Sequence, residues 1–290
     1  MTIPPSFDVI GKKLPDVLHF ISLKNTETNI AGFDEKFLIV TIQKRMVALG
    51  CSKIDNYLGL IAENQEENTL LIKLMQVGYS EFFRNPFTFA TIETILLPRM
   101  VKQRKKTSTG EIRFWSAACA NGQEPYSLAM ILEDYRETTK QLFPYRIFAT
   151  DINMELLDQA TSGYYSEKSL ENLTLRRLKK WFVPANGGYK ISEEIRRAVD
   201  FSVFDLLNEN MISPPVSIFG NFDMVFCCNL LIYYNADYRR KILEKLSKSL
   251  IPDGYLITGP AERQFVKEFG FHETIFNTAI FQKKTSRVNF

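Results

Sequence analysis

The chain has 290 residues, of which 45% are hydrophobic and 24% charged, and its formal net charge is +3. This composition supplies enough apolar material for two domains with cores of their own, and its near-neutral charge argues against nucleic acid as the main partner. No apolar run approaches the roughly 20 residues of a membrane span, so we expect no insertion into a membrane, and the N-terminal residues lack a signal-peptide layout.

The four cysteines are Cys51, Cys119, Cys227 and Cys228, and none of them has the C-x-x-C spacing of many metal and redox sites. Because the chain has only two histidines as well, we expect no metal site. Free thiols favour the reducing cytoplasm. Cys119 and Cys227 end strands that we expect to be neighbours, and we interpret both as small buried hydrophobic side chains.

The first 77 residues show the apolar spacing of helices. Apolar residues recur at Phe37, Ile39, Val40, Ile42, Met46 and Val47, and again at Tyr57, Leu58, Leu60 and Ile61. We predict a small helical domain over residues 1–77, with a turn near residues 50–51. Its charges nearly balance, so a local basic patch at Lys44 and Arg45 is as compatible with a solvated face as with a docking surface.

Residues 78–110 are predicted to link this domain to the rest of the chain. The linker carries a basic run at residues 99–106, R-M-V-K-Q-R-K-K, for which nucleic-acid binding is the rival interpretation. The run is short, has no interleaved aromatic residues, and lies in a chain that is not otherwise basic. We therefore interpret it as a solvated helix end followed by a loop.

The most informative stretch lies between residues 114 and 151. Residues 115–119 read as a buried strand, residues 120–122 as a small-residue turn, and residues 125–133 as a helix opened by a proline. A second strand at residues 145–150 ends on Asp151, where a carboxylate can accept hydrogen bonds from ribose hydroxyls. This pattern predicts a site for a cofactor that contains adenosine.

The turn itself indicates which cofactor binds. A dinucleotide site needs several glycines beside a pyrophosphate, whereas this turn has only Gly122, followed by Glu124, which would repel a phosphate. S-adenosylmethionine has a ribose, a sulfonium and an ammonium group but no phosphate, and it suits a carboxylate. The alternative is that Glu124 merely favours the dipole of the helix that starts there.

The remaining segments complete the pattern of an α/β fold. A turn near residues 186–188 is flanked by short strands, and later we expect a strand at 222–227, a helix at 237–250, a Pro-Asp-Gly turn at 252–254, a strand at 255–258 and a hairpin at 272–276 and 279–283. This order is typical of a Rossmann-like methyltransferase sheet whose last strand is antiparallel.

Four blocks of sequence resemble one family in order and spacing. They are residues 80–84 (S-E-F-F-R), 115–127 (W-S-A-A-C-A-N-G-Q-E-P-Y-S), 149–152 (A-T-D-I) and 226–233 (F-C-C-N-L-L-I-Y). The chain is similar over nearly its whole length to the CheR family, the S-adenosylmethionine-dependent methyltransferases that esterify glutamate side chains of bacterial chemotaxis receptors.

The resemblance implies an α/β fold: a Rossmann-like class I methyltransferase sheet over residues 111–290, with a small N-terminal helical domain and a small inserted β-subdomain at about 181–203. It also implies S-adenosyl-L-methionine as cofactor, S-adenosyl-L-homocysteine as product, and the cytoplasmic helical region of chemotaxis receptors as partner. We expect a monomer that binds no nucleic acid.

The resemblance also assigns roles to particular positions. It implies cofactor contacts at Ser80, Arg84, Glu124, Asp151, Asp205, Leu206, Asn229 and Leu230. It implies that Arg84 and Tyr233 are catalytic, with Tyr233 beside the site of methyl transfer.

Four positions depart from the family pattern. Cys228 stands where the family usually has arginine, Asp205 where it often has asparagine, Gly78 where it has a polar residue and Gln123 where glutamate is common. Asp205 can still accept a hydrogen bond from an adenine amino group. Cys228 removes a cation near the site and bears on the substrate range. Two alternatives therefore stay open: a cofactor-binding regulatory or scaffold protein without catalysis, and a methyltransferase for another substrate.

Overall fold

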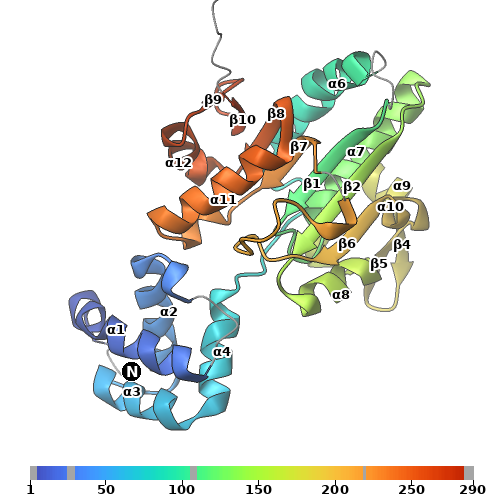
Figure 1. Cartoon of the computed structure of the whole chain (residues 1–290). Coiled ribbons are helices and arrows are strands. Elements are labelled where there is room, and N and C mark those ends of the chain that lie inside the picture. Colours follow the sequence, from blue (N-terminus) through green and yellow to red (C-terminus); the bar gives the residue numbers. More distant parts are fainter. Residues whose placement is uncertain (1–4, 25–29, 105–109, 218–219, 284–290) are drawn as a thin grey trace, which may run out of the picture. The chain divides into compact units, whose positions relative to one another are not determined.

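The computed structural model describes residues 5–24, 30–104, 110–217 and 220–283 (Figure 1). The chain divides into two compact units, Met1–Val77 with Ile232–Arg239, and Gly78–Leu231 with Arg240–Phe290. In the part of the chain that the structure describes, no helix is long and apolar enough to cross a bilayer.

The first unit is helical. Its helices are α1 (Phe7–Lys24), α2 (Glu35–Ala48), α3 (Ile54–Glu63) and α4 (Gln65–Met75). Two of them begin at side-chain caps, since Asp34 accepts the amide of Lys36, and Asn64 accepts those of Glu66 and Glu67.

The predicted apolar face of α2 is only partly buried. Leu38, Ile39, Ile42 and Met46 are buried, but Val40 and Val47 are 41% and 51% exposed. The buried stripe of α2 runs through residues 38, 39, 42 and 46, and Val40 and Val47, which the apolar spacing also included, project from the other side of the helix.

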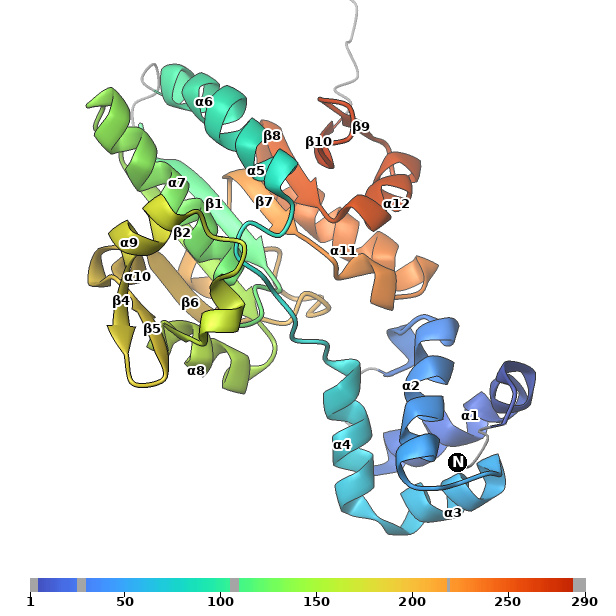
Figure 2. The same ribbon diagram turned by 180° about the vertical axis from the view of Figure 1, so that it is seen from behind.

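The second unit is built on a seven-stranded sheet in the order β6-β2-β1-β7-β8-β10-β9 (Figures 1 and 2). The strands are β1 (Ile112–Ala117), β2 (Tyr145–Asp151), β6 (Val199–Val203), β7 (Phe222–Cys227), β8 (Leu250–Thr258), β9 (Phe271–Glu273) and β10 (Ile280–Lys283). The first five in spatial order pair in parallel, while β10 pairs antiparallel with both β8 and β9. The predicted α/β sheet with an antiparallel end is confirmed.

Helices cover both faces of this sheet. They are α5 (Pro86–Thr91), a single π-helical turn (Ile92–Leu96), α6 (Leu97–Arg104), α7 (Gln123–Thr139), α8 (Met154–Ser162), α11 (Ala236–Ser249) and α12 (Arg263–Glu268). In the two views, α6 and α7 lie on one face and α11 on the other (Figures 1 and 2).

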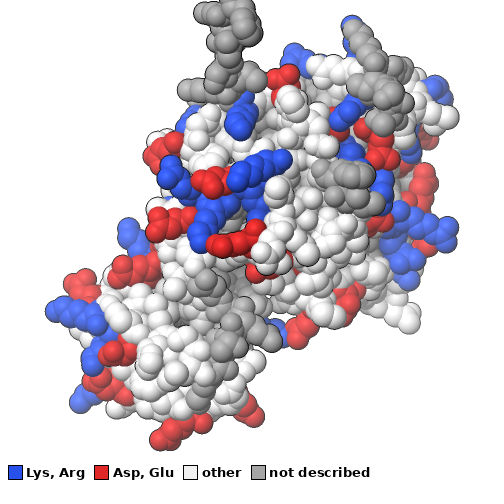
Figure 3. Space-filling view, in the orientation of Figure 1, with Lys and Arg blue, Asp and Glu red and all other residues white. Residues whose placement is uncertain are grey.

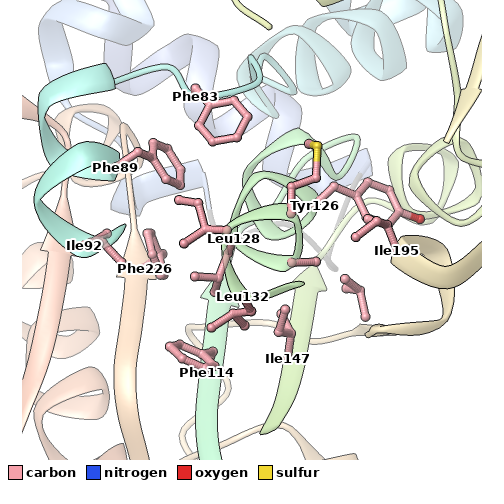
Figure 4. Packing of buried hydrophobic residues seen from close by; sticks show 14 of the residues in the cluster. Phe83, Phe89, Ile92, Phe114, Tyr126, Leu128, Leu132, Ile147, Ile195 and Phe226 are labelled. Carbon is pink, nitrogen blue, oxygen red and sulfur yellow. The ribbon is translucent and has the colours of Figure 1, made fainter. Parts of the chain in front are cut away.

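Helix α7 is the centre of the core. Leu128, Ala129, Met130, Ile131 and Leu132 are all buried, so this helix is apolar around its whole circumference at this point. Figure 4 shows Leu128 and Leu132 between the strands of the large sheet and the aromatic side chains of the segment before β1, Phe83 and Phe89. Each buried side chain of this size contributes roughly 1.5–3 kcal/mol, which fixes the helix that follows β1 against the sheet.

A second, three-stranded sheet is inserted between β2 and β6. It consists of β3 (Tyr164–Tyr165), β5 (Gly188–Ile191) and β4 (Phe182–Ala185), and it is accompanied by α9 (Leu175–Trp181) and α10 (Glu193–Arg197). We call residues 164–197 the insertion.

The predicted limits of the β-subdomain, 181–203, were wrong at both ends. The small sheet starts at Tyr164, and Val199–Val203 is the edge strand of the large sheet. The turn near residue 187 revealed only the hairpin, whereas Val199–Val203 pairs with β2, and Phe201 of this strand packs against Tyr126 of α7.

Two further boundaries differ from the sequence prediction. The Pro-Asp-Gly segment does not separate a helix from a strand; it lies inside β8 as an irregularity, where Phe222 pairs with Leu250 and Met224 with Tyr255. Of the basic run at 99–106, residues 105 and 106 lie outside the described residues, and Arg104 forms an ion pair with Asp223 at 2.7 Å.

Candidate functional site

A pocket opens where the strand order of the large sheet reverses. From β1 the chain passes to β2 on one side, while β7 lies on the other, and such switch points are the usual ligand sites of open α/β sheets. The pocket is lined by Tyr79, Ser80, Glu81, Arg84, Asn85, Thr88, Phe89, Ala118, Cys119, Ala120, Glu124, Phe226, Cys228, Asn229 and Ile257. All of these residues belong to the second unit.

The loop between β1 and α7 forms one wall of the pocket in a strained conformation. Ala118, Ala120 and Gly122 have φ angles of 60°, 49° and 86°. Only glycine adopts such angles without cost, so the two alanines are held there by their surroundings. Two bonds supply that restraint: Cys119 donates its amide to the carbonyl of Thr150 at 2.9 Å, and Ala120 donates its amide to Asp151 at 2.9 Å.

Glu124, in the first turn of α7, presents a carboxylate to the pocket. Its Oε1 accepts a hydrogen bond from the hydroxyl of Ser116 at 2.7 Å. Burial raises the pKa of this carboxyl, and the hydrogen bond from Ser116, the neighbouring thiol of Cys228 and the charge of Arg84 oppose that rise. A desolvated carboxylate of this kind favours a cationic ligand group beside it.

Asp151, at the end of β2, lies directly behind the same loop. Its carboxylate accepts the amides of Ala120 and Asn153, each at 2.9 Å, and the residue is only 8% exposed. Burial raises the pKa of the Asp151 carboxyl, while these amide bonds lower it. A carboxylate has about four acceptor positions, and the amides of Ala120, Asn153 and Ile152 all act on this one, so an acceptor position remains for a ligand.

Arg84 belongs to the loop at residues 79–85, which forms the opposite wall of the pocket. Its guanidinium lies 5.3 Å from the ring centre of Tyr79 and donates to the carbonyl of Tyr79 at 3.4 Å. Ser80 lines the pocket beside it. The arginine is therefore anchored to its own loop, and its charge acts on Glu124 across the pocket.

Asn229 follows β7 and completes the wall. Its φ is 59°, and its side-chain Oδ1 is buried without a hydrogen-bond partner. Such an unsatisfied acceptor costs free energy unless a ligand or water donates to it. The backbone of Asn229 is fixed by a hydrogen bond, because its amide donates to Glu262 at 2.8 Å.

Glu262 anchors this segment, although the sequence analysis did not select it. The fully buried carboxylate accepts the amides of Gly259, Asn229 and Leu231 at 2.6, 2.8 and 2.6 Å. Burial raises the pKa of Glu262 to about 7, against the lowering effect of these bonds. The sequence carries a signal for it, since Glu262 stands three residues after Gly259 in G-P-A-E, where a glutamate side chain can accept the amide of the N-cap residue.

Five of the expected site residues lie outside the pocket lining: Asp151, Asp205, Leu206, Leu230 and Tyr233. Asp205 uses Oδ1 to accept the amide of Leu207 at 2.7 Å, and Leu206 is buried. Tyr233 belongs to the first unit, where its ring packs on Phe37 with ring centres 4.8 Å apart. The pocket thus brings together Ser80, Arg84, Glu124 and Asn229.

The departures from the family pattern have local explanations. Cys228 lines the pocket and donates its thiol to the carbonyl of Ile257 at 3.8 Å, so a neutral thiol occupies the place of the expected cation. At Gly78 a Cβ atom would lie 2.4 Å from Cδ1 of Leu156, so a side chain there would require the Leu156 side chain to move. The Gln123 side chain is buried with Oε1 unpaired, and its carbonyl accepts the hydroxyl of Ser127 at 2.6 Å.

The hydrogen-bond acceptors at this site fit S-adenosylmethionine. Glu124 offers a carboxylate to a cationic amino group, Asp151 retains an acceptor position for the ribose hydroxyls, and Asn229 has an unpaired buried acceptor. Phe89, Phe226 and Ile257 supply apolar walls. Among the described residues, no cluster of three or more His, Cys, Asp or Glu side chains is placed to hold a metal ion.

Comparison with known proteins gives one family and several relatives. Residues 79–279 match the family model described as CheR methyltransferase, SAM binding domain. The chain is 33% identical over 225 residues to the chemotaxis protein methyltransferase of Escherichia coli K12, covering 76% of this chain and 73% of that protein. It is 30% identical over 229 residues to the chemotaxis protein methyltransferase of Borreliella burgdorferi, covering 76% and 79%. A solved structure of the N-methyltransferase NodS from Bradyrhizobium japonicum covers 70% of this chain and 90% of that one at 14% identity, and its TM-score of 0.34 is too low to bear on function.

Proposed function

Because the chain belongs to the CheR methyltransferase family, we propose that it transfers methyl groups from S-adenosylmethionine to glutamate carboxylates of chemotaxis receptors. That it is an S-adenosylmethionine-dependent methyltransferase follows from the family itself. The glutamate esters are the finer part of the proposal, and they rest on the chemistry of the pocket.

One observation carries the proposal: Arg84 lines a pocket whose described lining residues include no neutral base. Among the described residues that line it, none is histidine or lysine, and the carboxylate of Glu124 already accepts a hydrogen bond from Ser116. A glutamate substrate has a pKa near 4.3 and is ionised at neutral pH, so it needs no base, whereas a lysine with a pKa near 10.4 would.

When bound, S-adenosylmethionine supplies the methyl group and carries the positive charge that the transfer neutralises. The protein's part is placement and exclusion of water, and placement alone contributes several kcal/mol when reacting atoms are held in line. Arg84 orients the incoming carboxylate through a shared contact, because tight pairing would stabilise the ground state. The role proposed for Tyr233, to hydrogen-bond the carboxylate or wall the methyl site, rests on the family resemblance alone, since its ring packs on Phe37 within the first unit.

Each proposed cofactor contact has its own chemistry. Glu124 receives the amino end, Asp151 the ribose hydroxyls and Asp205 the adenine amino group. Ser80, Leu206, Asn229 and Leu230 complete the contacts. The buried carboxylates favour this phosphate-free cation over a nucleotide, since a phosphate would face like charge.

The proposed partner is the cytoplasmic helical region of the receptors, met by a monomer of this chain in the cytoplasm. The free state of all four cysteines supports a reducing compartment. On the face drawn in Figure 3, acidic and basic side chains alternate without a broad basic field, which supports a protein partner rather than nucleic acid.

The test uses tritiated S-adenosylmethionine and membranes that contain candidate receptors. We expect label on a receptor, and its loss when the receptor's methylated glutamates are replaced by alanine. Binding of S-adenosylhomocysteine with no label on any receptor would contradict the proposal. That result would favour a cofactor-binding regulator, for which the replacement of a cation by Cys228 is the supporting feature.

A further inference from the structure

The loop that carries Arg84 is held in a strained conformation. Phe83, the residue before it, has a φ of 50°, which is a costly angle for an aromatic residue. Its amide donates to the hydroxyl of Ser127 at 3.0 Å, and this hydroxyl donates to the carbonyl of Gln123. The ring packs on Phe89, with centres 5.3 Å apart (Figure 4). Helix α7 therefore fixes one side of the loop.

The insertion holds the other side, one residue after another. Asn172 donates its side-chain amide to Glu81 at 3.2 Å. Phe82 meets the rings of Tyr165 and Phe182 edge-on, with centres 4.9 and 5.4 Å apart. Three consecutive loop residues before Arg84 thus have partners in the insertion, since Phe83 has one as well.

The partner of Phe83 is Arg177 of α9. Its guanidinium lies 4.4 Å from the ring centre of Phe83, within the range of a cation–π interaction. The guanidinium is itself fixed, because Nε donates to Asp134 at 3.0 Å and Nη2 donates to Glu93 at 2.7 Å. Arg177 is only 9% exposed, so its side chain is buried and fixed by these bonds.

We propose that Arg177 is a positioning residue for Arg84, acting through Phe83, so that the insertion holds the active-site loop as well as extending the fold. Only the expected loss of turnover rests on the proposed function; the effect of Arg177 on the loop does not. Releasing the Phe83 ring lets its backbone leave the left-handed region, which moves Arg84 relative to the pocket. Glu124 lies on α7 and Asp151 on β2, outside this loop, so we expect their cofactor contacts to be retained.

The test compares Arg177→Met with Arg176→Ala. Arg176 is the neighbour on the same helix and has a 69% exposed side chain. It contacts the same Asp134 at 3.4 Å, so it controls for the loss of an ion pair with Asp134. Hydrogen exchange at residues 79–85 needs no substrate, and we expect about tenfold faster exchange of the Phe83 amide in Arg177→Met only. Turnover should fall by about tenfold with S-adenosylhomocysteine affinity within about twofold of the wild type.

A second variant, Phe83→Leu, keeps the ion pairs of Arg177 and removes only the ring. We expect it to reproduce the effects of Arg177→Met, and the double variant to be no worse than either single one. Unchanged exchange at the loop in folded Arg177→Met would overturn the proposal, as would additive losses in the double variant. If the wild type methylates no receptor, the proposed function fails, while the exchange experiment still decides whether Arg177 holds the loop.

Discussion

Replacing Glu262 by glutamine removes the charge that anchors the segment around Asn229 while keeping the shape of the side chain. Burial raises the pKa of this carboxyl to about 7 in the folded protein, against about 4.3 in an unfolded chain. A raised folded pKa means that the group's contribution to stability is fully present below about pH 4.3 and is lost as the pH rises through 7. Since one pKa unit corresponds to about 1.4 kcal/mol, the loss amounts to about 2 kcal/mol between pH 5 and pH 8.

The assay is urea denaturation of the wild type and Glu262→Gln at several pH values between 5 and 8. We expect the difference in unfolding free energy between them to shift by about 2 kcal/mol across this range, with the wild type relatively more stable at the acidic end. Glu268→Gln, an exposed carboxylate on α12, is the matched control and should show no such shift. A constant difference between wild type and Glu262→Gln would refute the assignment of this titration to Glu262.

The same variant tests the role of Glu262 at the pocket. A glutamine turns one acceptor oxygen into a donor that faces backbone amides, and an unsatisfied buried amide costs about 1–3 kcal/mol. We therefore expect S-adenosylhomocysteine to bind Glu262→Gln about tenfold more weakly by calorimetry, with Glu268→Gln unchanged. Unchanged affinity in folded Glu262→Gln would show that Asn229 keeps its place without this anchor.

Three further predictions concern the pocket and its rate. Asp151→Ala should weaken S-adenosylhomocysteine binding by more than about 1 kcal/mol, and equal affinity in calorimetry would refute its ribose role. Arg84→Ala should lose far more turnover than cofactor affinity, with partial recovery in Arg84→Lys, and equal losses would make it a binding residue only. The methyl-transfer rate should stay flat from about pH 6 to 8, since the substrate carboxylate is ionised throughout, and a steep rise in single-turnover experiments would point to an amine substrate.

The sequence was most informative where local pattern and burial coincide. The strand at residues 145–151 ends on Asp151 as expected, and residues 222–227 form β7 with the expected bounds, because both are short runs bounded by polar or turn residues. Helix α7 begins at Gln123, two residues before the predicted Pro125, and Gly122, with a φ of 86°, is its N-cap. Local patterns therefore located the elements more reliably than their ends.

Long-range pairing accounts for what the sequence could not reveal. Val199–Val203 belongs to the large sheet only because it pairs with β2, a contact across more than fifty residues of chain. Glu262 lies 33 residues beyond the amide of Asn229 that it binds, so its role depends on β7 and β8 being neighbours. Likewise, the contact of Arg177 with Phe83 arises from the folding of the insertion onto the loop, which no local motif encodes.

The central claim is that the acceptor is a carboxylate. Receptors labelled with tritiated S-adenosylmethionine by the wild-type protein should be treated with mild alkali, and the volatile tritium should be collected. Carboxyl methyl esters release methanol under these conditions, so we predict that nearly all receptor label becomes volatile. Label that stays on the protein after alkali would mean N-methylation, and it would contradict the glutamate-esterifying function proposed for this chain.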